Sequence, residues 1–224
     1  ALSMDVSAEE LKRSLQLIGR SSVRATHTVN QLLALARAES AGTQLQRQPC
    51  NMVELVVDVL QDLLHQALAR QADMGYEGAE AERPDVWVLG NATLLKELVS
   101  NLLTNALHYS PSTAQRPAVI TARVLPDPDN KEVVLEIEDN GPGIAPQERE
   151  LVFQPFYRAL GNEADGSGLG LPIVQEIALQ HGGQVTLLDA HPERQPPGTC
   201  VRLRLPALAA QSDARAAADA DERM

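Results

Sequence analysis

Residues 97–109 read Glu-Leu-Val-Ser-Asn-Leu-Leu-Thr-Asn-Ala-Leu-His-Tyr, an apolar helix pattern with a polar stripe along one face. Glu97, Asn101 and Asn105 recur at i, i+4 and i+8, and His108 follows three residues later. Amides inside a helix lower its propensity and need hydrogen-bond partners when they are buried. Carbonyl oxygens one turn apart can face a common point, which suits Mg²⁺ because this ion prefers oxygen ligands. Taken alone, the stripe fits a metal site and a solvated helix edge equally well.

The composition limits the class of protein. A chain of 224 residues has room for one sizeable domain and an appendage, and its low aromatic content of 3% predicts an aliphatic core. The net charge of −11 argues against nucleic acid and anionic membrane surfaces as main partners. Cys50 and Cys200 have no metal-ligand companions nearby in the sequence, so we expect buried thiols in a reducing compartment. No apolar run approaches the roughly 18 residues of a membrane span.

Residues 8–40 carry an apolar seam with heptad spacing. Its members are Leu11, Leu15, Ile18, Ser22, Ala25, Val29, Leu32 and Ala36. A single helix of this length cannot bury such a seam alone. The regular register therefore favours a coiled coil or bundle over one long helix packed on its own domain.

The remaining chain mixes helices and strands without regular alternation. We predict a helix from Met52 to Arg70 with Asn51 as its N-cap, and a second helix over 169–180 in addition to the polar-striped one. Strands are predicted at 84–89, 119–125, 133–139, 184–188 and 199–205. This order indicates an α+β fold with a mostly antiparallel sheet and helices on one face.

A carboxylate follows the predicted strand at 133–139. Asp139 begins Asp-Asn-Gly-Pro-Gly-Ile, and glycines let a ligand approach the backbone closely. An aspartate accepts hydrogen bonds, so it can recognise the exocyclic amine of adenine, whereas guanine presents an oxygen there. Taken alone, the same residues also fit an ordinary Asp-Asn-Gly turn.

Two further segments suggest a phosphate site under a lid. Residues 165–171, Asp-Gly-Ser-Gly-Leu-Gly-Leu, open a helix whose N-terminal amides favour anions. Residues 153–158, Phe-Gln-Pro-Phe-Tyr-Arg, place two aromatic rings around a proline and end at Arg158, which can reach a phosphate. The polar stretch 157–165 between them is typical of a lid that orders over ligand, or of a plain surface loop.

The order of these segments is more specific than any one of them. The asparagine helix precedes Asp-x-Gly-x-Gly, then Phe-x-Pro-Phe, then Gly-x-Gly-x-Gly at a helix start. This series resembles the N, G1, F and G2 boxes of the sensor histidine kinases of two-component systems. These kinases belong to the GHKL ATPases, together with gyrase, the mismatch-repair protein and the heat-shock chaperone. The resemblance covers roughly residues 8–207 and implies a two-layer α/β sandwich (the Bergerat ATP-binding fold) preceded by a long dimerisation helix.

The resemblance assigns roles to the striped helix. Asn105 matches the residue that ligates Mg²⁺, and Asn101 matches the asparagine one turn earlier. Hydrolytic relatives carry a glutamate at the position of Asn101, where it acts as general base, and an amide cannot take a proton at neutral pH. The chain should therefore hold ATP without hydrolysing it rapidly. His108 stands where the family often has Lys or Arg contacting phosphate, a task that a neutral imidazole performs less well. Tyr109 matches a residue that packs near the nucleotide.

The resemblance also assigns the loops. Asp139 matches the adenine-reading carboxylate, with Gly141 and Gly143 shaping its loop, and Arg158 would assist catalysis from the lid. The loop on the phosphate side comprises Gly166, Ser167, Gly168, Leu169 and Gly170.

The resemblance divides the chain into four parts. These are a partial dimerisation and phosphotransfer region with only the second hairpin helix (1–42), a linker (43–52), a catalytic ATP-binding domain (53–207) and a disordered tail (208–224). The first residues look like a cut through a longer protein.

The phosphoacceptor box of the family is missing from this chain. The family carries a histidine in a His-Glu-Leu-Arg-Thr-Pro-like box on the first hairpin helix. The five histidines here are His27, His65, His108, His181 and His191, and none is followed by an acidic residue and a proline at that spacing. His27 would lie on the wrong helix. We therefore expect this chain to bind Mg·ATP without autophosphorylation.

The resemblance implies partners and a location. The partners are ATP, the receiver domain of a response regulator and a second copy of the chain through the helix at 8–40. It implies the cytoplasmic portion of a bacterial inner-membrane sensor, with the membrane reached only through upstream segments and with no nucleic acid partner.

Two alternatives remain open from the sequence. One is a serine kinase of the anti-sigma type with the same nucleotide fold, against which the heptad helix argues. The other is a non-enzymatic nucleotide-binding module, against which the intact Asn105, Asp139 and glycine loops argue.

Overall fold

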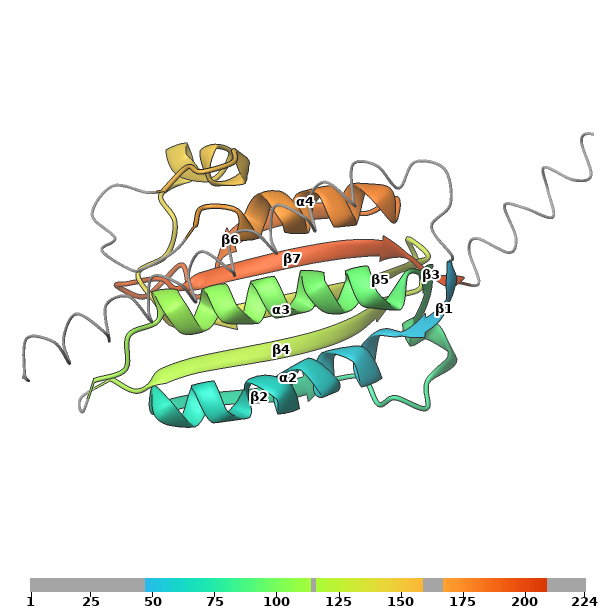
Figure 1. The fold of residues 1–224 in the computed structure, drawn as a ribbon, viewed down its shortest axis with the longest axis horizontal. Coiled ribbons are helices and arrows are strands. Elements are labelled where there is room, and N and C mark those ends of the chain that lie inside the picture. The colour runs from blue at the N-terminus through green and yellow to red at the C-terminus, as the bar shows by residue number, and fades with distance from the viewer. Residues whose placement is uncertain (1–46, 114–115, 159–166, 209–224) are drawn as a thin grey trace, which may run out of the picture.

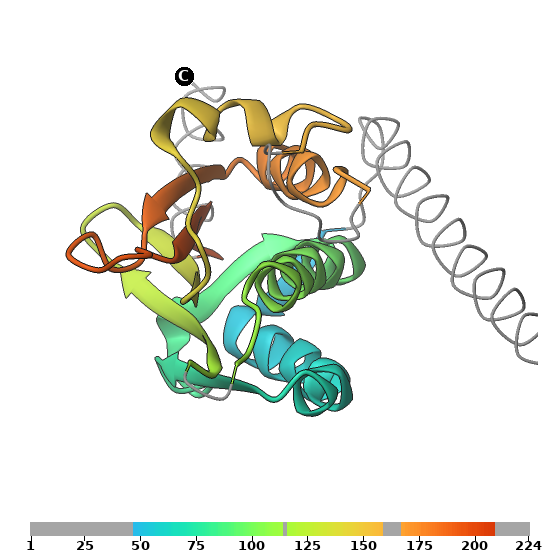
Figure 2. The same ribbon diagram turned by 90° about the vertical axis from the view of Figure 1, so that its left-hand side faces the viewer.

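Helices cover one face of a twisted five-stranded sheet (Figures 1 and 2). The computed structural model describes residues 47–113, 116–158 and 167–208. The sheet order is β2 (Ala72–Gly78), β4 (Ala118–Asp127), β5 (Glu132–Asp139), β7 (Thr199–Pro206) and β6 (Gln184–Asp189). The pair β2–β4 is parallel and the other pairs are antiparallel. The predicted α+β fold, with a mostly antiparallel sheet and helices on one face, is confirmed.

The helices on the sheet begin at residues that cap them. In α2 (Met52–Ala69), the Asn51 side chain accepts hydrogen bonds from the backbone amides of Val53 and Glu54, as its role as N-cap predicts. In α3 (Ala92–Tyr109), Asn91 does the same for the amide of Leu94. The third helix, α4 (Gly170–Gln180), follows the glycine-rich loop and has no side-chain cap. Its N-terminal amides are therefore not used by a capping side chain.

A small second sheet joins the start of the described chain to the helices. β1 (Gln48–Asn51) pairs antiparallel with β3 (Trp87–Gly90). Residues 48–52, which the sequence assigned to a linker, thus lie in β1 and at the start of α2. The predicted helix at 8–40 and the tail at 209–224 lie outside the described residues.

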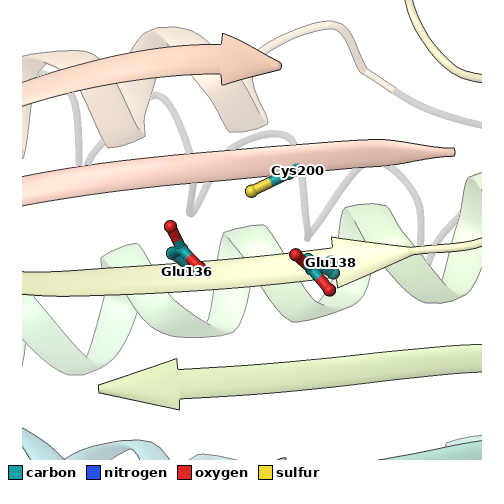
Figure 3. A group of neighbouring side chains, drawn as sticks. All are labelled: Glu136, Glu138 and Cys200. Carbon is teal, nitrogen blue, oxygen red and sulfur yellow. The ribbon is translucent and has the colours of Figure 1, made fainter. Parts of the chain in front are cut away.

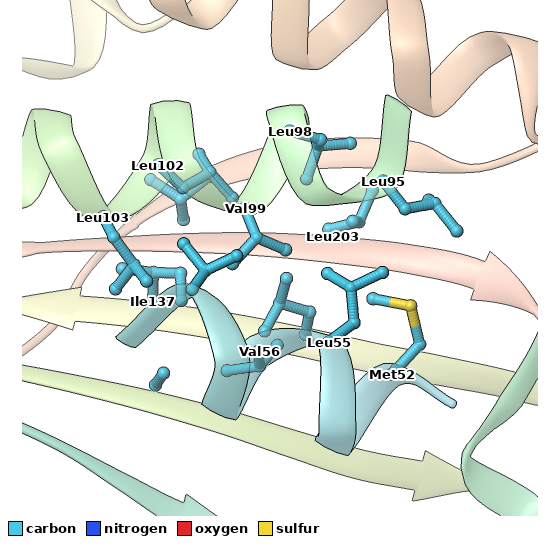
Figure 4. Packing of buried hydrophobic residues seen from close by; sticks show 14 of the residues in the cluster. Met52, Leu55, Val56, Leu95, Leu98, Val99, Leu102, Leu103, Ile137 and Leu203 are labelled. Atoms are coloured by element: carbon cyan, nitrogen blue, oxygen red, sulfur yellow. The ribbon is translucent and has the colours of Figure 1, made fainter. Parts of the chain in front are cut away.

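The core lies between the sheet and the helices and is aliphatic, as the composition predicted (Figure 4). Met52, Leu95, Leu98, Leu103 and Leu203 are among its largest fully buried side chains. Burial of each such side chain contributes about 1.5–3 kcal/mol. This packing holds α2 and α3 firmly on the sheet, so the polar residues of α3 are presented from a rigid element.

Two elements differ from the sequence prediction. β2 was missed because Ala-Asp-Met-Gly-Tyr-Glu-Gly contains two glycines and two acids, residue types that are rare in strands. The predicted strand at 84–89 begins instead as a 3₁₀ turn over Pro84–Val86, and strand geometry starts only at Trp87. Pro84 lacks a backbone N–H and fixes φ, which suits the first position of such a turn.

The sheet face away from the helices carries ion pairs (Figure 3). Arg202 Nε lies 2.7 Å from Glu136 Oε1, and Arg123 lies 2.5 Å from Glu138. Burial, and then the charges of Glu136 and Glu138, raise the pKa of Cys200 to about 12, so its thiol stays protonated. The acids and the thiol lie within 4.8 Å of one another. Because an arginine already neutralises each carboxylate, this cluster is poorly suited to a cation.

In the part of the chain that the structure describes, no helix is both long and apolar enough to cross a membrane.

Candidate functional site

Asp139 ends β5 and is buried, with 8% of its surface exposed. Its Oδ1 accepts hydrogen bonds from the backbone amides of Gly141 (2.8 Å) and Thr199 (3.3 Å). Burial raises the pKa of Asp139, and these two hydrogen bonds oppose the rise. The carboxyl group is therefore fixed in orientation at the end of the central strand.

Gly141 lies where the end of α3 meets the Asp139 loop. A Cβ at this position would lie 2.6 Å from the Tyr109 carbonyl oxygen, 2.9 Å from Asp139 Oδ1 and 3.0 Å from Ser110 Oγ. Ser110 Oγ is buried and has no hydrogen-bond partner among the described residues. Since buried hydroxyls are almost always paired, this one marks a place for a water molecule or a polar ligand atom beside Asp139.

The loop between β6 and β7 closes the other side of Asp139. A Cβ on Gly198 would approach the Asp139 carbonyl oxygen to 2.1 Å, so only glycine allows this contact. Gly143 has a φ of +82° and packs against Pro197. The predicted loop glycines, Gly141 and Gly143, therefore do shape this corner, together with a loop that the sequence did not indicate.

A cleft of about 450 Å³ opens at this corner, a volume typical of small-molecule sites. It is lined by His108, Tyr109, Pro111, Arg116, Asn140, Gly141, Pro142 and Pro196. The structure thus brings the end of α3 and the Asp139 loop together. Asn101, Asn105 and the second glycine loop do not line this cleft.

The polar stripe of α3 is not a solvated edge at its centre. Asn101 is 7% exposed, and its Nδ2 donates to the Glu97 carbonyl oxygen at 2.9 Å and lies 3.4 Å from Glu97 Oε1. Asn105 is half-buried one turn later. A Cβ on Gly170 would lie 3.0 Å from Asn105 Nδ2 and 3.1 Å from its Oδ1. The amide of Asn105 therefore faces the first residue of α4, where oxygen ligands for a cation and anion-binding backbone amides meet.

His108 turns toward α2 and is held in one tautomer. Its Nδ1 lies 3.0 Å from the Thr104 carbonyl oxygen, and its Nε2 lies 3.3 Å from Arg70, which also donates to the Leu107 carbonyl oxygen at 2.9 Å. A guanidinium can only donate, so Nε2 accepts and Nδ1 carries the proton. His108 is thus a neutral imidazole here, and the cation at this end of α3 is Arg70.

The second glycine loop is tied to the Phe-x-Pro-Phe segment. The Phe156 amide donates to the Gly168 carbonyl oxygen at 2.9 Å, and Phe156 is 62% exposed. Gly168 has a φ of +71°, and a Cβ there would lie 2.8 Å from the Phe156 carbonyl carbon. Ser167 Oγ accepts from the Leu169 amide at 3.2 Å. This contact closes the stem of the predicted lid.

The base of that lid is fastened to the sheet by Arg149. Its guanidinium contacts Asp189 at 2.6 Å and donates to the Ile144 carbonyl oxygen at 3.1 Å. The Tyr157 hydroxyl donates to Glu148 at 3.2 Å. The segment that leads into the lid is therefore anchored on β6 before the chain reaches residues outside the described ranges.

The remaining predicted site residues have simple outcomes. Leu169 is fully buried in the core, so only its backbone can face a ligand. Arg158 is the last described residue before 159–166, and Gly166 lies outside the described residues.

Sequence reasoning missed Ser110, Thr199 and Arg70. The Gly-Thr pair at the start of the last strand was a usable signal, because a glycine beside a strand often marks a close backbone approach. Ser110 and Arg70 gave no local signal, since their importance depends on Asp139 and His108, which lie far away in the sequence.

Comparisons with known proteins agree with this geometry. Residues 90–209 match the family described as histidine kinase-, DNA gyrase B-, and HSP90-like ATPase. The chain is 35% identical to the sensor protein kinase PmrB of Pseudomonas aeruginosa over 176 residues, which cover 78% of this chain and 35% of that protein. It is 38% identical to the signal transduction histidine-protein kinase/phosphatase MprB of Mycobacterium leprae over 179 residues, which cover 80% of this chain and 32% of that protein. The chain thus spans about a third of the length of these relatives.

Solved structures give the same picture. A mycobacterial sensor histidine kinase MprB is 33% identical, with a TM-score of 0.62 over 72% of this chain and 97% of that one. The histidine kinase ThkA, in complex with the response regulator protein TrrA, is 21% identical, with a TM-score of 0.66 over 91% of this chain and 53% of that one, and supports the fold alone.

Proposed function

Because this chain belongs to the family of histidine kinase-, DNA gyrase B- and HSP90-like ATPases, we propose that it is the catalytic region of a sensor histidine kinase, which binds Mg·ATP and transfers the γ-phosphoryl group to a histidine. The similarity to the sensor kinases PmrB and MprB favours the kinase branch of the family over its hydrolases. Each step below rests on residues of this chain.

The observation that carries the proposal is the corner formed by Asp139 and Ser110. One carboxylate oxygen is fixed by the amides of Gly141 and Thr199, and an unpaired buried hydroxyl lies beside it. An adenine fits this donor and acceptor set, because its exocyclic amine donates to the carboxylate. A guanine places a carbonyl oxygen there and leaves a buried carboxylate unpaired, which costs about 1–3 kcal/mol or more. The corner therefore favours adenine.

The phosphates would follow α3 toward the N-terminus of α4. The backbone around Ser167, Gly168 and Gly170 and the uncapped end of α4 favour anions there. Asn105 faces Gly170 and, with Glu97 and Asn101 behind it, would hold Mg²⁺ through oxygen ligands. Bound Mg²⁺ would neutralise charge on the phosphate oxygens. Arg158, at the edge of the lid, would contact the transferred phosphoryl group.

The residue at position 101 favours transfer to a protein nucleophile over hydrolysis. Asn101 is an amide whose Nδ2 is committed to Glu97, so it cannot take a proton from water. In the proposed reaction an acceptor histidine nitrogen forms a bond to the γ-phosphorus, the bond to the β-phosphate oxygen breaks, and ADP leaves. None of the five histidines of this chain stands in the family's acceptor box, so the acceptor would come from elsewhere in the kinase.

We further propose the partners that the kinase role requires. The phosphoryl group would pass from histidine to an aspartate in the receiver domain of a response regulator. The heptad seam at 8–40 would form a homodimer, which light scattering tests as a mass that rises with protein concentration. Such kinases place this region on the cytoplasmic side of a bacterial inner membrane.

Nucleotide titration by calorimetry tests the function. We expect ATP to bind with higher affinity in the presence of Mg²⁺, and GTP to bind at least about tenfold more weakly than ATP. Equal affinity for the two nucleotides would contradict the role of Asp139. With γ-labelled ATP, the chain should retain no alkali-stable label, and a retained label would identify an acceptor histidine within it.

A further inference from the structure

His181 joins the far ends of the two helices that face the candidate nucleotide site. It follows α4 directly and is 3% exposed. The backbone amide of Asn91, the N-cap of α3, donates to its Nε2 at 3.1 Å, and its Nδ1 lies 2.7 Å from the Ile177 carbonyl oxygen. One imidazole therefore connects the C-terminus of α4 to the N-terminus of α3.

This connection is chemically fixed. A backbone amide can only donate, so Nε2 accepts, and the ring proton must lie on Nδ1, where it bonds to the Ile177 carbonyl oxygen. Both ring nitrogens are thus committed to the backbone. Burial lowers the pKa of His181, which keeps the ring in this neutral form.

The end of β3 fits against the same ring. A Cβ on Gly90 would lie 2.8 Å from His181 Cδ2 and 2.7 Å from Leu95 Cδ1. No larger residue fits there without displacing the ring or α3. The two helices and the strand are therefore packed around His181 with no free space for rearrangement at this point.

The start of the described chain contacts this joint directly. Arg47 donates to the Gln180 carbonyl oxygen at 2.6 Å, at the last turn of α4. The next residues form β1, which pairs with β3, so Gln48 is the partner of Gly90. Any force applied through the chain that enters the domain therefore reaches the end of α4 and the end of β3 first.

The opposite ends of the same two helices form the phosphate side of the site. Asn105 of α3 faces Gly170, the first residue of α4, so the helices are antiparallel and touch at both ends. At 1.5 Å per residue, α4 places Gly170 about 16 Å from His181. A rigid helix that is held at one end transmits a tilt to the other, so the joint at His181 influences the Asn105–Gly170 contact.

We propose that His181 is a positioning residue for the nucleotide site, and that Arg47 couples the entering chain to the site through it. The inference rests on the proposed function, since it assigns regulation to the same site. It predicts that changes at Arg47, which is far from Asn105, alter both the order of the first turn of α4 and nucleotide affinity.

The experiment uses the full chain and two independent readouts. Amide hydrogen exchange of residues 170–174 without nucleotide reports the joint directly, and the affinity for a fluorescent ATP analogue with Mg²⁺ reports the site. Arg47→Ala removes the contact to Gln180, and Arg47→Lys restores a donor. Arg83→Ala is the matched control, because Arg83 is an exposed arginine that pairs only with Asp85 among the described residues.

We expect Arg47→Ala to speed exchange at 170–174 and to weaken analogue binding by about threefold or more. Arg47→Lys should stay near wild type, and Arg83→Ala should change neither readout. His181→Gln keeps an acceptor for the Asn91 amide and should exceed His181→Phe in protection at 170–174. Exchange at 170–174 that is the same in Arg47→Ala and Arg83→Ala would overturn the proposal. Absence of nucleotide binding in the wild type would instead overturn the proposed function, while the exchange readout still decides the joint.

Discussion

The side-chain amide of Asn105 and the backbone of Gly170 approach so closely that a Cβ on Gly170 would lie 3.0 Å from Asn105 Nδ2. This contact joins the proposed metal ligand on α3 to the anion-binding start of α4. Its partners lie on different helices, and each depends on the other for its place.

The first prediction concerns Gly170→Ala. The new methyl group should push the flexible Asn105 amide away by a few tenths of an ångström, while alanine favours the helix by up to about 1 kcal/mol. We expect an unchanged or raised melting temperature together with a loss of the Mg²⁺-dependent part of ATP affinity. Calorimetric titration with and without Mg²⁺ measures this. A Mg²⁺ effect equal to that of the wild type would show that Asn105 does not serve the metal.

The second prediction concerns Asp139→Asn. Burial raises the pKa of Asp139 above its value in the unfolded chain, so the charged form costs stability once the pH exceeds the folded pKa. Asparagine keeps the oxygen that accepts from Gly141 and Thr199 but carries no charge. We therefore expect a melting temperature at pH 7.5 that is higher by about 2–4 °C for each kcal/mol recovered.

The same substitution should weaken ATP binding by about tenfold or more, because an amide nitrogen would face the adenine amine. Ser110→Ala is the comparison, since it removes the adjacent hydroxyl and leaves the carboxylate in place. A stabilised Asp139→Asn protein that still prefers ATP to GTP would contradict the adenine-reading role.

The third prediction concerns Asn101→Glu, which introduces a general base. General bases contribute about 10²- to 10⁴-fold to rate, so ATP hydrolysis should rise by about tenfold or more even with imperfect geometry. Because Asn101 is buried and bonded to Glu97, a second carboxylate there should also cost about 1–3 kcal/mol of stability. Phosphate release at saturating ATP measures the gain. Asn101→Gln, which is longer but not basic, should show no increase.

These predictions also mark how far the sequence leads. Asn51 and Asp139 could be assigned from the sequence because capping and a strand-end carboxylate are signalled by immediate neighbours. β2 escaped because its edge position tolerates poor strand formers. Arg70 and His181 escaped because their roles come from contacts to His108 and Asn91, 38 and 90 residues away. Local chemistry is written in the sequence, whereas pairings between distant elements appear only when the chain is folded.

The fourth prediction concerns the thiols. Cys50 and Cys200 are both free and buried, and burial raises both pKa values. The thiolate is the reactive form, so neither residue should react with a disulfide reagent at pH 8 while the domain is folded. A colorimetric thiol assay should detect both thiols only after denaturant is added. Rapid modification of the native protein would show that the sheet face around Cys200 opens readily.

The last prediction concerns acid stability and His181. Burial lowers its pKa from 6.5, so below pH 6.5 the unfolded chain binds a proton that the folded chain resists. Stability due to His181 is therefore complete above pH 6.5 and falls as the pH drops toward the lower, folded pKa. Asp139 acts in the opposite direction, because its raised pKa makes the folded state bind protons more readily as the pH falls through it. Melting curves from pH 8 to pH 5 should thus show a decline in the wild type that is smaller in His181→Gln, because glutamine keeps an acceptor for Asn91 but does not titrate. Parallel curves for the two proteins would mean that another group controls the acid response.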